Sequence, residues 1–241
     1  MAERAALVTG ASGGIGGAIA AALARDGCQV TITGRNEQRL DELARELDPP
    51  GGQVTVVAAD VRDEGDIDRI LEAHGKAYGR LDVLVNSAGG GIMAPLDSLK
   101  TRHIDLQLEL NLRSVILAFK ASLPLLRAAV ATAGYANVVN ISSAAGLYGQ
   151  AGLSVYSAAK KGLVGFTEAA NAEFGDEGIR STVFLPGLVD TPLAEAYSTP
   201  PEQMIRVEDL AEAIRLLLRL SPRCLIPEIS FLPPAGQFGD Q

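Results

Sequence analysis

The sequence predicts an α/β fold, in which a doubly wound parallel sheet of seven strands carries helices on both faces and residues 1–241 form a single domain. Three observations lead to this prediction. Short apolar, β-rich runs alternate with helical patterns along the chain, which is typical of parallel sheets. Runs such as Val83-Leu84-Val85 are apolar throughout, as expected of a strand whose two faces are both covered and not exposed to solvent. No repeat or low-complexity linker divides the chain.

Seven segments have the length and composition of buried strands, and they are Ala5–Thr9, Gln29–Thr33, Gln53–Ala58, Leu81–Asn86, Ala136–Ile141, Ser181–Leu185 and Ile226–Phe231. Helical patterns lie between them, and they are Ile15–Arg25, Glu37–Leu47, Asp63–Ala77 and Glu208–Leu220. The strongest break, Asp48-Pro49-Pro50-Gly51-Gly52, predicts a turn between a helix and a strand. Tyr197–Gln203 is predicted as a loop.

Composition excludes several classes of protein. Apolar residues make up 47% and charged residues 21% of the chain, as in soluble globular proteins. The net charge of -8 disfavours nucleic acid or an anionic membrane as a partner. No apolar run reaches the roughly 20 residues of a spanning helix, and Ala5–Val8 is too short for a signal peptide core.

The cysteines and histidines point to no disulfide and no metal. Cys28 and Cys224 have no paired spacing, which favours a reducing, cytoplasmic location. His74 and His103 have no neighbours at metal-ligand spacing, so we expect both to be surface residues and expect no metal site.

A glycine-rich turn, Thr9-Gly10-Ala11-Ser12-Gly13-Gly14-Ile15-Gly16, follows the first strand and opens a helix. Glycines let the backbone approach a pyrophosphate, and the helix N-terminus offers free N–H groups. The spacing G-x-x-x-G-x-G differs from the usual G-x-G-x-x-G fingerprint. The alternative is a tight turn that needs glycine only for its shape. Its place after the first strand of an alternating chain favours nucleotide binding.

This turn resembles that of the short-chain dehydrogenase/reductase family, and the resemblance extends over five motifs in order, from Thr9 to about Leu218. It implies a Rossmann-type fold and an oxidoreductase that moves a hydride between a nicotinamide and a carbonyl or alcohol carbon of a small molecule. The end of the chain departs from the family, because Ile226–Pro234 replaces the usual glycine-rich last strand. Within the turn, the predicted cofactor-binding residues are Gly10, Ser12, Gly14, Ile15 and Gly16.

The end of the second strand predicts the choice of nicotinamide cofactor. An acid there usually holds the free ribose 2′-hydroxyl of NAD, but this chain has Gly34-Arg35-Asn36. Arg35 can pair with a 2′-phosphate by charge-assisted hydrogen bonds, so we expect NADP(H). The alternative is a solvated arginine that caps a loop.

Three later segments match the family's cofactor site. After the third strand, Asp60 corresponds to an acid that hydrogen-bonds the adenine, and Val61 follows it. After the fourth strand, the chain reads Asn-Ser-Ala-Gly where the family usually has Asn-Asn-Ala-Gly. After the sixth strand, a Pro-Gly segment corresponds to the one along the nicotinamide. The residues implied in the last two segments are Asn86, Ala88, Gly89, Pro186, Gly187, Val189 and Thr191.

A tyrosine and a lysine supply the predicted proton chemistry. Lys160 follows Tyr156 by four residues, which places both on one helix face. A nearby ammonium stabilises phenolate, so we expect the pKa of the tyrosine to be lowered. The tyrosine could then act as a general acid or base. The resemblance also places both residues in the cofactor site. Ser143 lies thirteen residues before the tyrosine, and in the family the catalytic serine has this spacing. Ser142 does not match that spacing. By resemblance, Asn111 holds a water in a proton relay through the lysine.

Two alternatives compete with an active reductase. One is a binding or regulatory protein on the same fold that has lost catalysis. The other is an epimerase or dehydratase of the related longer branch, which the chain length and glycine spacing disfavour. The expected pocket lining is mostly apolar, and it consists of Gly91-Ile92-Met93, Leu147-Tyr148, Leu188 and Leu193.

Many members of the family are tetramers built on two long helices. Here the second of these helices carries a run of small or flat residues suited to close contact between helices. They are Ala158, Ala159, Gly162, Phe166 and Ala170. We therefore expect a homo-oligomer, a tetramer. The alternative is that these residues pack inside their own subunit.

Overall fold

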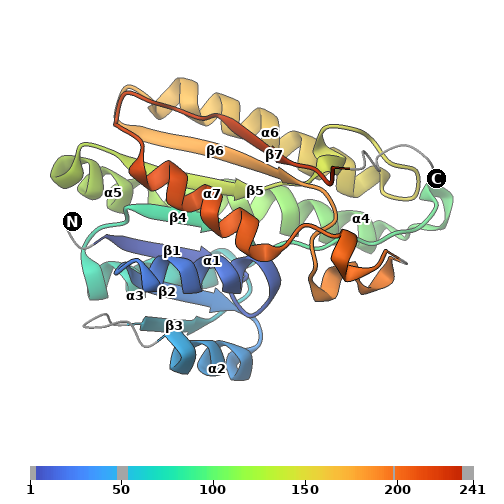
Figure 1. Ribbon diagram of the computed structural model, residues 1–241, viewed down its shortest axis with the longest axis horizontal. Helices are drawn as coiled ribbons and strands as arrows, with labels where there is room; N and C mark the ends of the chain where they lie inside the picture. Colours follow the sequence, from blue (N-terminus) through green and yellow to red (C-terminus); the bar gives the residue numbers. More distant parts are fainter. Residues whose placement is uncertain (1–3, 48–53, 198, 235–241) are drawn as a thin grey trace.

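The computed structural model describes residues 4–47, 54–197 and 199–234. Seven strands form one parallel sheet in the order β3-β2-β1-β4-β5-β6-β7 (Figure 1). The strands are β1 Ala5–Thr9, β2 Gln29–Gly34, β3 Val54–Ala58, β4 Val83–Asn86, β5 Ala136–Ile141, β6 Ile179–Pro186 and β7 Glu228–Phe231. The predicted fold class is confirmed: this is a doubly wound, Rossmann-type sheet, and the order reverses between β1 and β4.

Two strands begin two residues later than predicted, because the backbone N–H groups at their predicted starts do not join the sheet. The N–H of Leu81 donates to the carbonyl of Leu125 at 3.0 Å, outside the sheet, so β4 begins at Val83. Pro227 has no N–H to give to a ladder, and β7 begins after it. The start predicted for β3, at Gln53, and the turn at 48–52 lie outside the described residues.

Helices connect the strands, and they are α1 Gly14–Arg25, α2 Glu37–Leu47, α3 Glu64–Tyr78, α4 Thr101–Leu108, α5 Ser114–Ala133, α6 Ser154–Phe174 and α7 Val207–Arg219. A π-helical turn, η2 Glu109–Arg113, joins α4 to α5. Short 3₁₀ turns complete the connections, and they are η1 Leu96–Ser98, η3 Ala144–Gly146, η4 Pro192–Ala196 and η5 Pro201–Gln203. The loop predicted at 197–203 thus contains η5.

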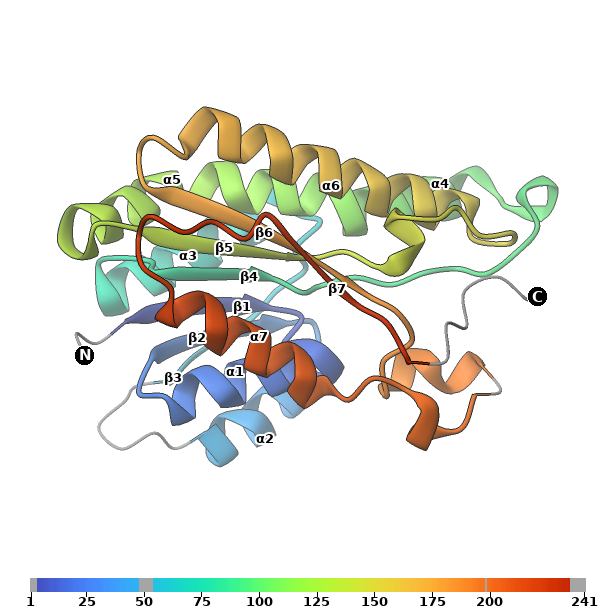
Figure 2. The same ribbon diagram turned by 45° about the horizontal axis from the view of Figure 1, so that its top comes forward.

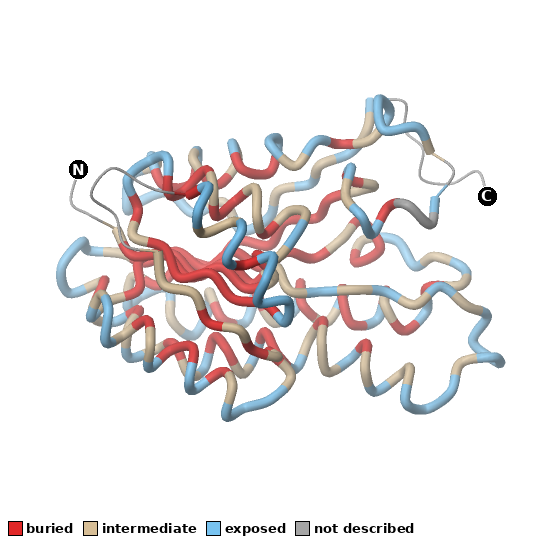
Figure 3. The backbone as a smooth tube through the Cα atoms, turned by 90° about the horizontal axis from the view of Figure 1, so that it is seen from below, coloured by how far each residue is buried: buried red, intermediate tan, exposed pale blue. Residues whose placement is uncertain are grey.

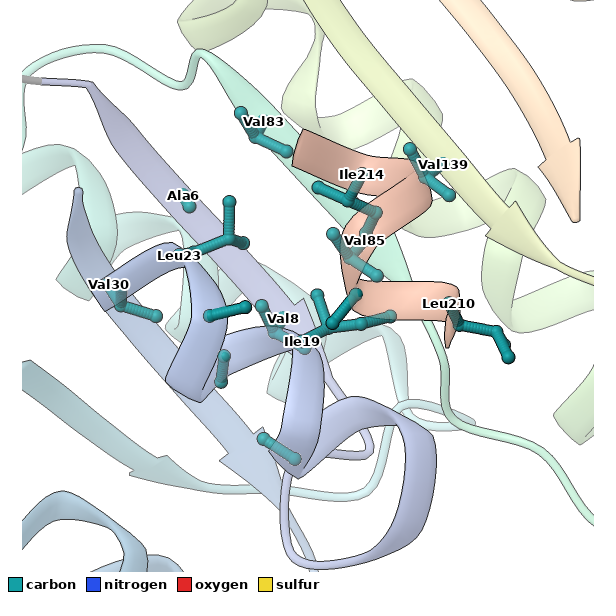
Figure 4. Packing of buried hydrophobic residues seen from close by; sticks show 14 of the residues in the cluster. Ala6, Val8, Ile19, Leu23, Val30, Val83, Val85, Val139, Leu210 and Ile214 are labelled. Carbon is teal, nitrogen blue, oxygen red and sulfur yellow. The ribbon is translucent and has the colours of Figure 1, made fainter. Parts of the chain in front are cut away.

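Side chains alternate between two cores, one on each face of the sheet. In β1, Ala6 and Val8 pack with α1 and α7, where Ile19 and Ile214 are buried (Figure 4). Leu7 points to the other face, which α3, α5 and α6 cover (Figures 1 and 2). The central strands are buried along their length (Figure 3). This double cover explains why the strand segments read as apolar runs.

One helical stretch, Thr101–Ala133, is long and apolar enough to cross a membrane by length and composition alone, a match that we did not expect from the sequence. Lys120 and Arg127 interrupt its apolar sequence, and a third of its apolar window is buried. Its own residues Phe119 and Leu126 lie in the core. A core helix of a soluble protein passes the same test.

We expected His74 to be a surface residue, but it lies on the buried face of α3 and is fully buried. Its Nδ1 lies 2.8 Å from the hydroxyl of Thr31, and its Nε2 lies 3.0 Å from the carbonyl oxygen of Arg80. Burial lowers its pKa to about 4, so the ring is neutral and can donate to one partner while accepting from the other. The histidine is a hydrogen-bonded link between β2 and the end of α3.

The run of small residues on α6 packs mostly inside the subunit, which corrects its assignment to an interface. Ala159 and Ala170 are buried within the chain. A Cβ on Gly162 would lie 3.0 Å from Leu112, and the ring of Phe166 packs on that of Phe119. Ala158 alone among the five named residues is exposed.

Candidate active site

The glycine-rich turn folds tightly against the end of β4. Gly10 has φ +70°, and a Cβ there would lie 2.7 Å from the backbone nitrogen of Ala88. A Cβ on Gly16 would lie 2.5 Å from the carbonyl oxygen of Gly10. Both positions therefore exclude any larger residue. Gly13 is the N-cap of α1 and has no side chain to cap it, so the first N–H groups remain available to an anion.

Thr9 ties this turn to the segment after β4. Its buried hydroxyl oxygen accepts hydrogen bonds from the N–H groups of Ser87 at 3.1 Å and Ala88 at 3.2 Å. It also donates to the carbonyl of Val85 at 3.4 Å. Thr9 thus fixes two neighbouring loops at the point where the strand order reverses.

Arg35 follows β2 directly and is exposed. Ser12 lies beside it, because a Cβ on the neighbouring Gly34 would be 2.7 Å from the Ser12 hydroxyl oxygen. The charge of Arg35 also reaches Asp60, whose pKa it helps to lower. The end of β2 therefore presents a cation and a hydroxyl on the side of the glycine-rich turn.

The carboxylate of Asp60 is shared with a residue that the sequence analysis did not select. Arg62 Nη2 lies 2.5 Å from one of its oxygens, and Arg62 Nε donates to the other at 3.0 Å. These hydrogen bonds hold the pKa of Asp60 below its usual range. Asp60 is ionised and retains acceptor capacity for a further donor. The side chain of Val61, predicted at the cofactor site, is buried in the core, so only its backbone is open to a ligand.

Asn86 also points away from the predicted site. Its amide donates to Asn140 Oδ1 at 2.9 Å, and Asn140 donates to the hydroxyl of Thr167 at 3.0 Å. This buried chain of hydrogen bonds links β4, β5 and α6. Asn86 therefore positions the carboxyl end of its strand, and any contact with a cofactor would come from its backbone.

Ser143, Tyr156 and Lys160 converge at the carboxyl end of β5. The Ser143 hydroxyl accepts from the N–H of Ala145 at 3.1 Å and lies close enough to Tyr156 to favour the ionised form of its phenol. Lys160 Nζ lies 5.5 Å from the centroid of the Tyr156 ring and donates to the carbonyl of Ile141 at 2.8 Å. Ser142 turns the other way, because its hydroxyl donates to the carbonyl of Lys160 at 2.9 Å. Ser142 thus holds α6 in place, and Ser143 faces the tyrosine.

The pKa of Tyr156 differs from the expectation. Burial raises it to about 12; the nearby hydroxyl of Ser143 opposes this rise, and the neighbouring Tyr197 adds to it. Burial lowers the pKa of Lys160 to about 8. Burial is the largest influence on the pKa of the phenol, although Lys160 lies over the ring and bonds to the carbonyl of Ile141.

Asn111 lies in the π-helical turn and is fully buried. Its Nδ2 donates to the carbonyls of Gly90 and Gln107, both at 2.8 Å, and its Oδ1 accepts from the N–H of Gly90 at 3.1 Å. A Cβ on Gly89 would lie 3.1 Å from Asn111 Oδ1 and 3.3 Å from Lys160 Nζ. Asn111 therefore braces the segment after β4, close to the lysine; its relay through a water stays a prediction.

The Pro186-Gly187 segment closes the site from the other side. The N–H of Gly187 donates to the carbonyl of Phe231 at 2.8 Å, and Val189 pairs with Ile205. The hydroxyl of Thr191 donates to the carbonyl of Val189 at 3.2 Å. A Cβ on Gly14 would lie 3.1 Å from Thr191 Cγ2. The segment after β6 thus reaches the glycine-rich turn.

Comparisons with known proteins agree with this geometry. A family model described as short chain dehydrogenase matches residues 4–202. The chain belongs to the short-chain dehydrogenase family. It is similar to an uncharacterised oxidoreductase of Staphylococcus epidermidis, with 31% identity over 96% of this chain and 97% of that protein.

Solved structures resemble this short-chain dehydrogenase along nearly its whole length. An alcohol dehydrogenase from Thermococcus sibiricus, complexed with 5-hydroxy-NADP, superposes with a TM-score of 0.89 at 27% identity and covers 99% of this chain and 100% of its own. A 3-ketoacyl-(acyl-carrier-protein) reductase from Brucella melitensis, complexed with NADH, gives a TM-score of 0.86 at 25% identity over 95% of each chain. These relatives bind nicotinamide cofactors of both kinds.

The cradle in this short-chain dehydrogenase fits such a cofactor. Gly10 and Gly16 keep side chains out of the turn, and the uncapped start of α1 suits a pyrophosphate. Sequence reasoning missed Thr9 and Arg62 as positioning residues. Thr9 stood in the quoted motif, so its hydroxyl was the available signal. No pattern in the sequence pointed to Arg62. Within 4–47, 54–197 and 199–234, no three His, Cys, Asp or Glu side chains are grouped to hold a metal.

Proposed function

We propose that this short-chain dehydrogenase interconverts a carbonyl compound and a secondary alcohol with NADP(H), and that Tyr156 is its general acid and base. The observation that carries this proposal is the convergence of Ser143, Tyr156 and Lys160 at the carboxyl end of β5, beside the glycine-rich turn. Ligands of open α/β sheets bind at this edge, next to the point where the strand order reverses.

Each side chain has a separate task in this proposal. With a pKa of about 12, the Tyr156 phenol is protonated at neutral pH and can donate its proton to a carbonyl oxygen. The Ser143 hydroxyl orients that oxygen. Lys160, with a pKa of about 8, can exchange protons near neutrality and supplies positive charge beside the phenol. A bound nicotinamide would supply or accept the hydride.

The preference for NADP(H) is supported by Arg35 and by the lack of an acid directly after β2. Ser12 adds a hydroxyl on the same side. Gly10, Gly14 and Gly16 would hold the pyrophosphate, and Asp60 would accept a hydrogen bond from the adenine amine. The segment with Val189 and Thr191 would contact the carboxamide.

A catalytically silent binder on the same fold is the second candidate. A binder would not need the tyrosine hydroxyl. Replacement of Tyr156 by Phe keeps the ring but removes the proton, so we expect the rate of carbonyl reduction to fall on the order of 10²–10⁴-fold, with cofactor affinity barely changed. Tyr135→Phe is the matched control, because Tyr135 directly precedes β5, at the end of that strand away from the site, where its hydroxyl accepts from Arg4 at 2.9 Å.

The measurement is steady-state reduction of a carbonyl panel with NADPH and with NADH, together with cofactor titration of each variant. Near-native turnover in Tyr156→Phe would assign the proton to another group. Absence of turnover with every carbonyl, despite tight cofactor binding, would favour the silent binder.

A further inference from the structure

We propose that the substrate is a bulky, uncharged, apolar ketone or its secondary alcohol, and that its remote end packs on Met93, Tyr148 and Leu193. This inference rests on the proposed function, because it concerns the substrate of the same site. We therefore expect the site to bind apolar, uncharged molecules and to exclude substrates that carry a carboxylate or a phosphate.

Three large apolar side chains stand exposed around the site. Met93 is 55%, Tyr148 60% and Leu193 57% exposed. They belong to the segments that follow β4, β5 and β6, which leave the same end of the sheet (Figures 1 and 2). Single exposed apolar residues are ordinary. Three from separate segments at one end, beside the proposed acid, indicate a surface that binds an apolar ligand.

Backbone contacts bring the first two segments together over Tyr156. A Cβ on Gly91 would lie 3.2 Å from Tyr156 Cδ2, so the chain after β4 runs along the tyrosine ring. Two residues later, the N–H of Ala94 donates to the carbonyl of Gly152 at 2.9 Å. The side chain of Met93 lies against Gly152, with 3.5 Å between Cγ and a Cβ built there. The methionine therefore sits beside the loop that carries Tyr148.

The third segment approaches from the side of the cofactor cradle. Thr191 begins the 3₁₀ turn that carries Leu193, and its methyl group packs toward Gly14. At the end of that turn, Tyr197 is close enough to Tyr156 to affect its pKa. The turn thus lies next to both the cradle and the proposed acid.

The charges in these three segments favour an uncharged substrate. The sequence contains no Lys, Arg or His in residues 87–99, 144–153 or 187–197, but it has Asp97 and Asp190 there. The nearest basic residues along the chain are Lys100 and Arg102, which belong to the start of α4. An anionic substrate would lose water at this surface without gaining a cation from these segments, and the net charge of -8 would oppose it further.

Three ketones with the same reacting carbonyl test this inference. They are butan-2-one, 4-phenylbutan-2-one and 4-(3-oxobutyl)benzoate, which add first an apolar ring and then a charge. We expect kcat/KM with NADPH to rise at least about tenfold from the first to the second and to fall at least about tenfold from the second to the third. Equal or better use of the benzoate would overturn the inference.

Substitutions test which residues cause the preference for the apolar ketone. Met93→Ala and Leu193→Ala should lower the preference for 4-phenylbutan-2-one over butan-2-one about five- to tenfold each. Leu225→Ala is the control, since Leu225 is an exposed leucine just before the start of β7, at the end of the strand away from the site. An unchanged preference in both site variants would overturn the assignment of these residues.

Measurements of binding distinguish a failure of this inference from a failure of the proposed reaction. Calorimetric titration of the three ketones into the protein with NADP⁺ forms complexes that cannot react. Tighter binding of 4-phenylbutan-2-one than of the other two would support the apolar site even if no ketone were reduced, and that lack of reduction would count against the reaction. Equal binding of the benzoate would overturn the inference whatever the turnover.

Discussion

Arg35 decides the choice of cofactor in our proposal, and its replacement gives a sharp test. A hydrogen bond to a charged group contributes about 1.5–3 kcal/mol, so Arg35→Ala should weaken NADPH binding about 10- to 100-fold. NADH has no 2′-phosphate, and its affinity should change little. Arg45→Ala, on the exposed face of α2, removes the same charge and is the control. Equal dissociation constants for NADPH and NADH in the native protein would contradict the preference.

Two adjacent serines should respond differently to the same substitution. Ser143→Ala removes a hydroxyl close to the Tyr156 phenol, and we expect kcat to fall about 10²-fold, as for other lost donors to a reacting oxygen. Ser142→Ala removes a buried hydrogen bond to the carbonyl of Lys160 and should lower the free energy of unfolding by about 1 kcal/mol. Steady-state rates and urea unfolding of both variants check this. A larger loss of rate in Ser142→Ala would reverse the roles.

At the scale of elements, His74 links β2 to α3 and should make the fold sensitive to acid. Its folded pKa of about 4 lies below the unfolded value of 6.5. The unfolded chain therefore binds more protons between these values, so the contribution is complete above pH 6.5 and is lost as pH falls toward 4. The loss amounts to about 3 kcal/mol, at 1.36 kcal/mol for each pKa unit.

A variant that cannot titrate isolates this effect. His74→Gln keeps a donor and an acceptor, and its free energy of unfolding should fall less between pH 7 and pH 4 than that of the native protein. Denaturant unfolding at several pH values measures the difference, because other titrating groups contribute equally to both proteins. Parallel curves would show that the histidine does not carry the acid sensitivity.

The apolar periodicity predicted where strands and helices lie, but it could not place features that depend on contacts between distant segments. The late start of β4 depends on Leu125, which lies 44 residues after Leu81. The burial of His74 depends on Thr31 and on the carbonyl of Arg80. Tyr156 and Lys160 were predicted on one helix face, yet the direction of the phenol pKa followed from burial, which spacing does not reveal.

At the scale of the whole molecule, the sheet order concentrates the site at one place. The order reverses between β1 and β4, so the helices that follow these two strands cover opposite faces of the sheet. Open α/β sheets bind their ligands at the carboxyl ends of the strands beside such a reversal. Thr9 spans that point by binding Ser87 and Ala88. The segments after β5 and β6 then bring Ser143 and Thr191 to the same edge. The topology thus brings the glycine-rich turn close to the proposed proton donor.

Assembly into a tetramer remains a prediction, and the exposed sides of α5 and α6 are where we expect the contact. These helices lie side by side across one face of the sheet (Figures 1 and 2). Ile116 on α5 is 37% exposed, and Gly165 on α6 is exposed with open space where a Cβ would stand. Because the subunit does not fill this space, Gly165→Arg should leave the fold intact and block close contact between two copies.

Light scattering at micromolar concentration measures the outcome. We expect four times the mass of the 25.1 kDa chain for the native protein and a smaller mass for Gly165→Arg and Ile116→Arg. Leu216→Arg, on the exposed side of α7, is the matched control and should keep the native mass. Circular dichroism of each variant checks that the fold persists. A monomeric mass for the native protein would rule out the tetramer, and a native mass in both interface variants would place the contact on another surface.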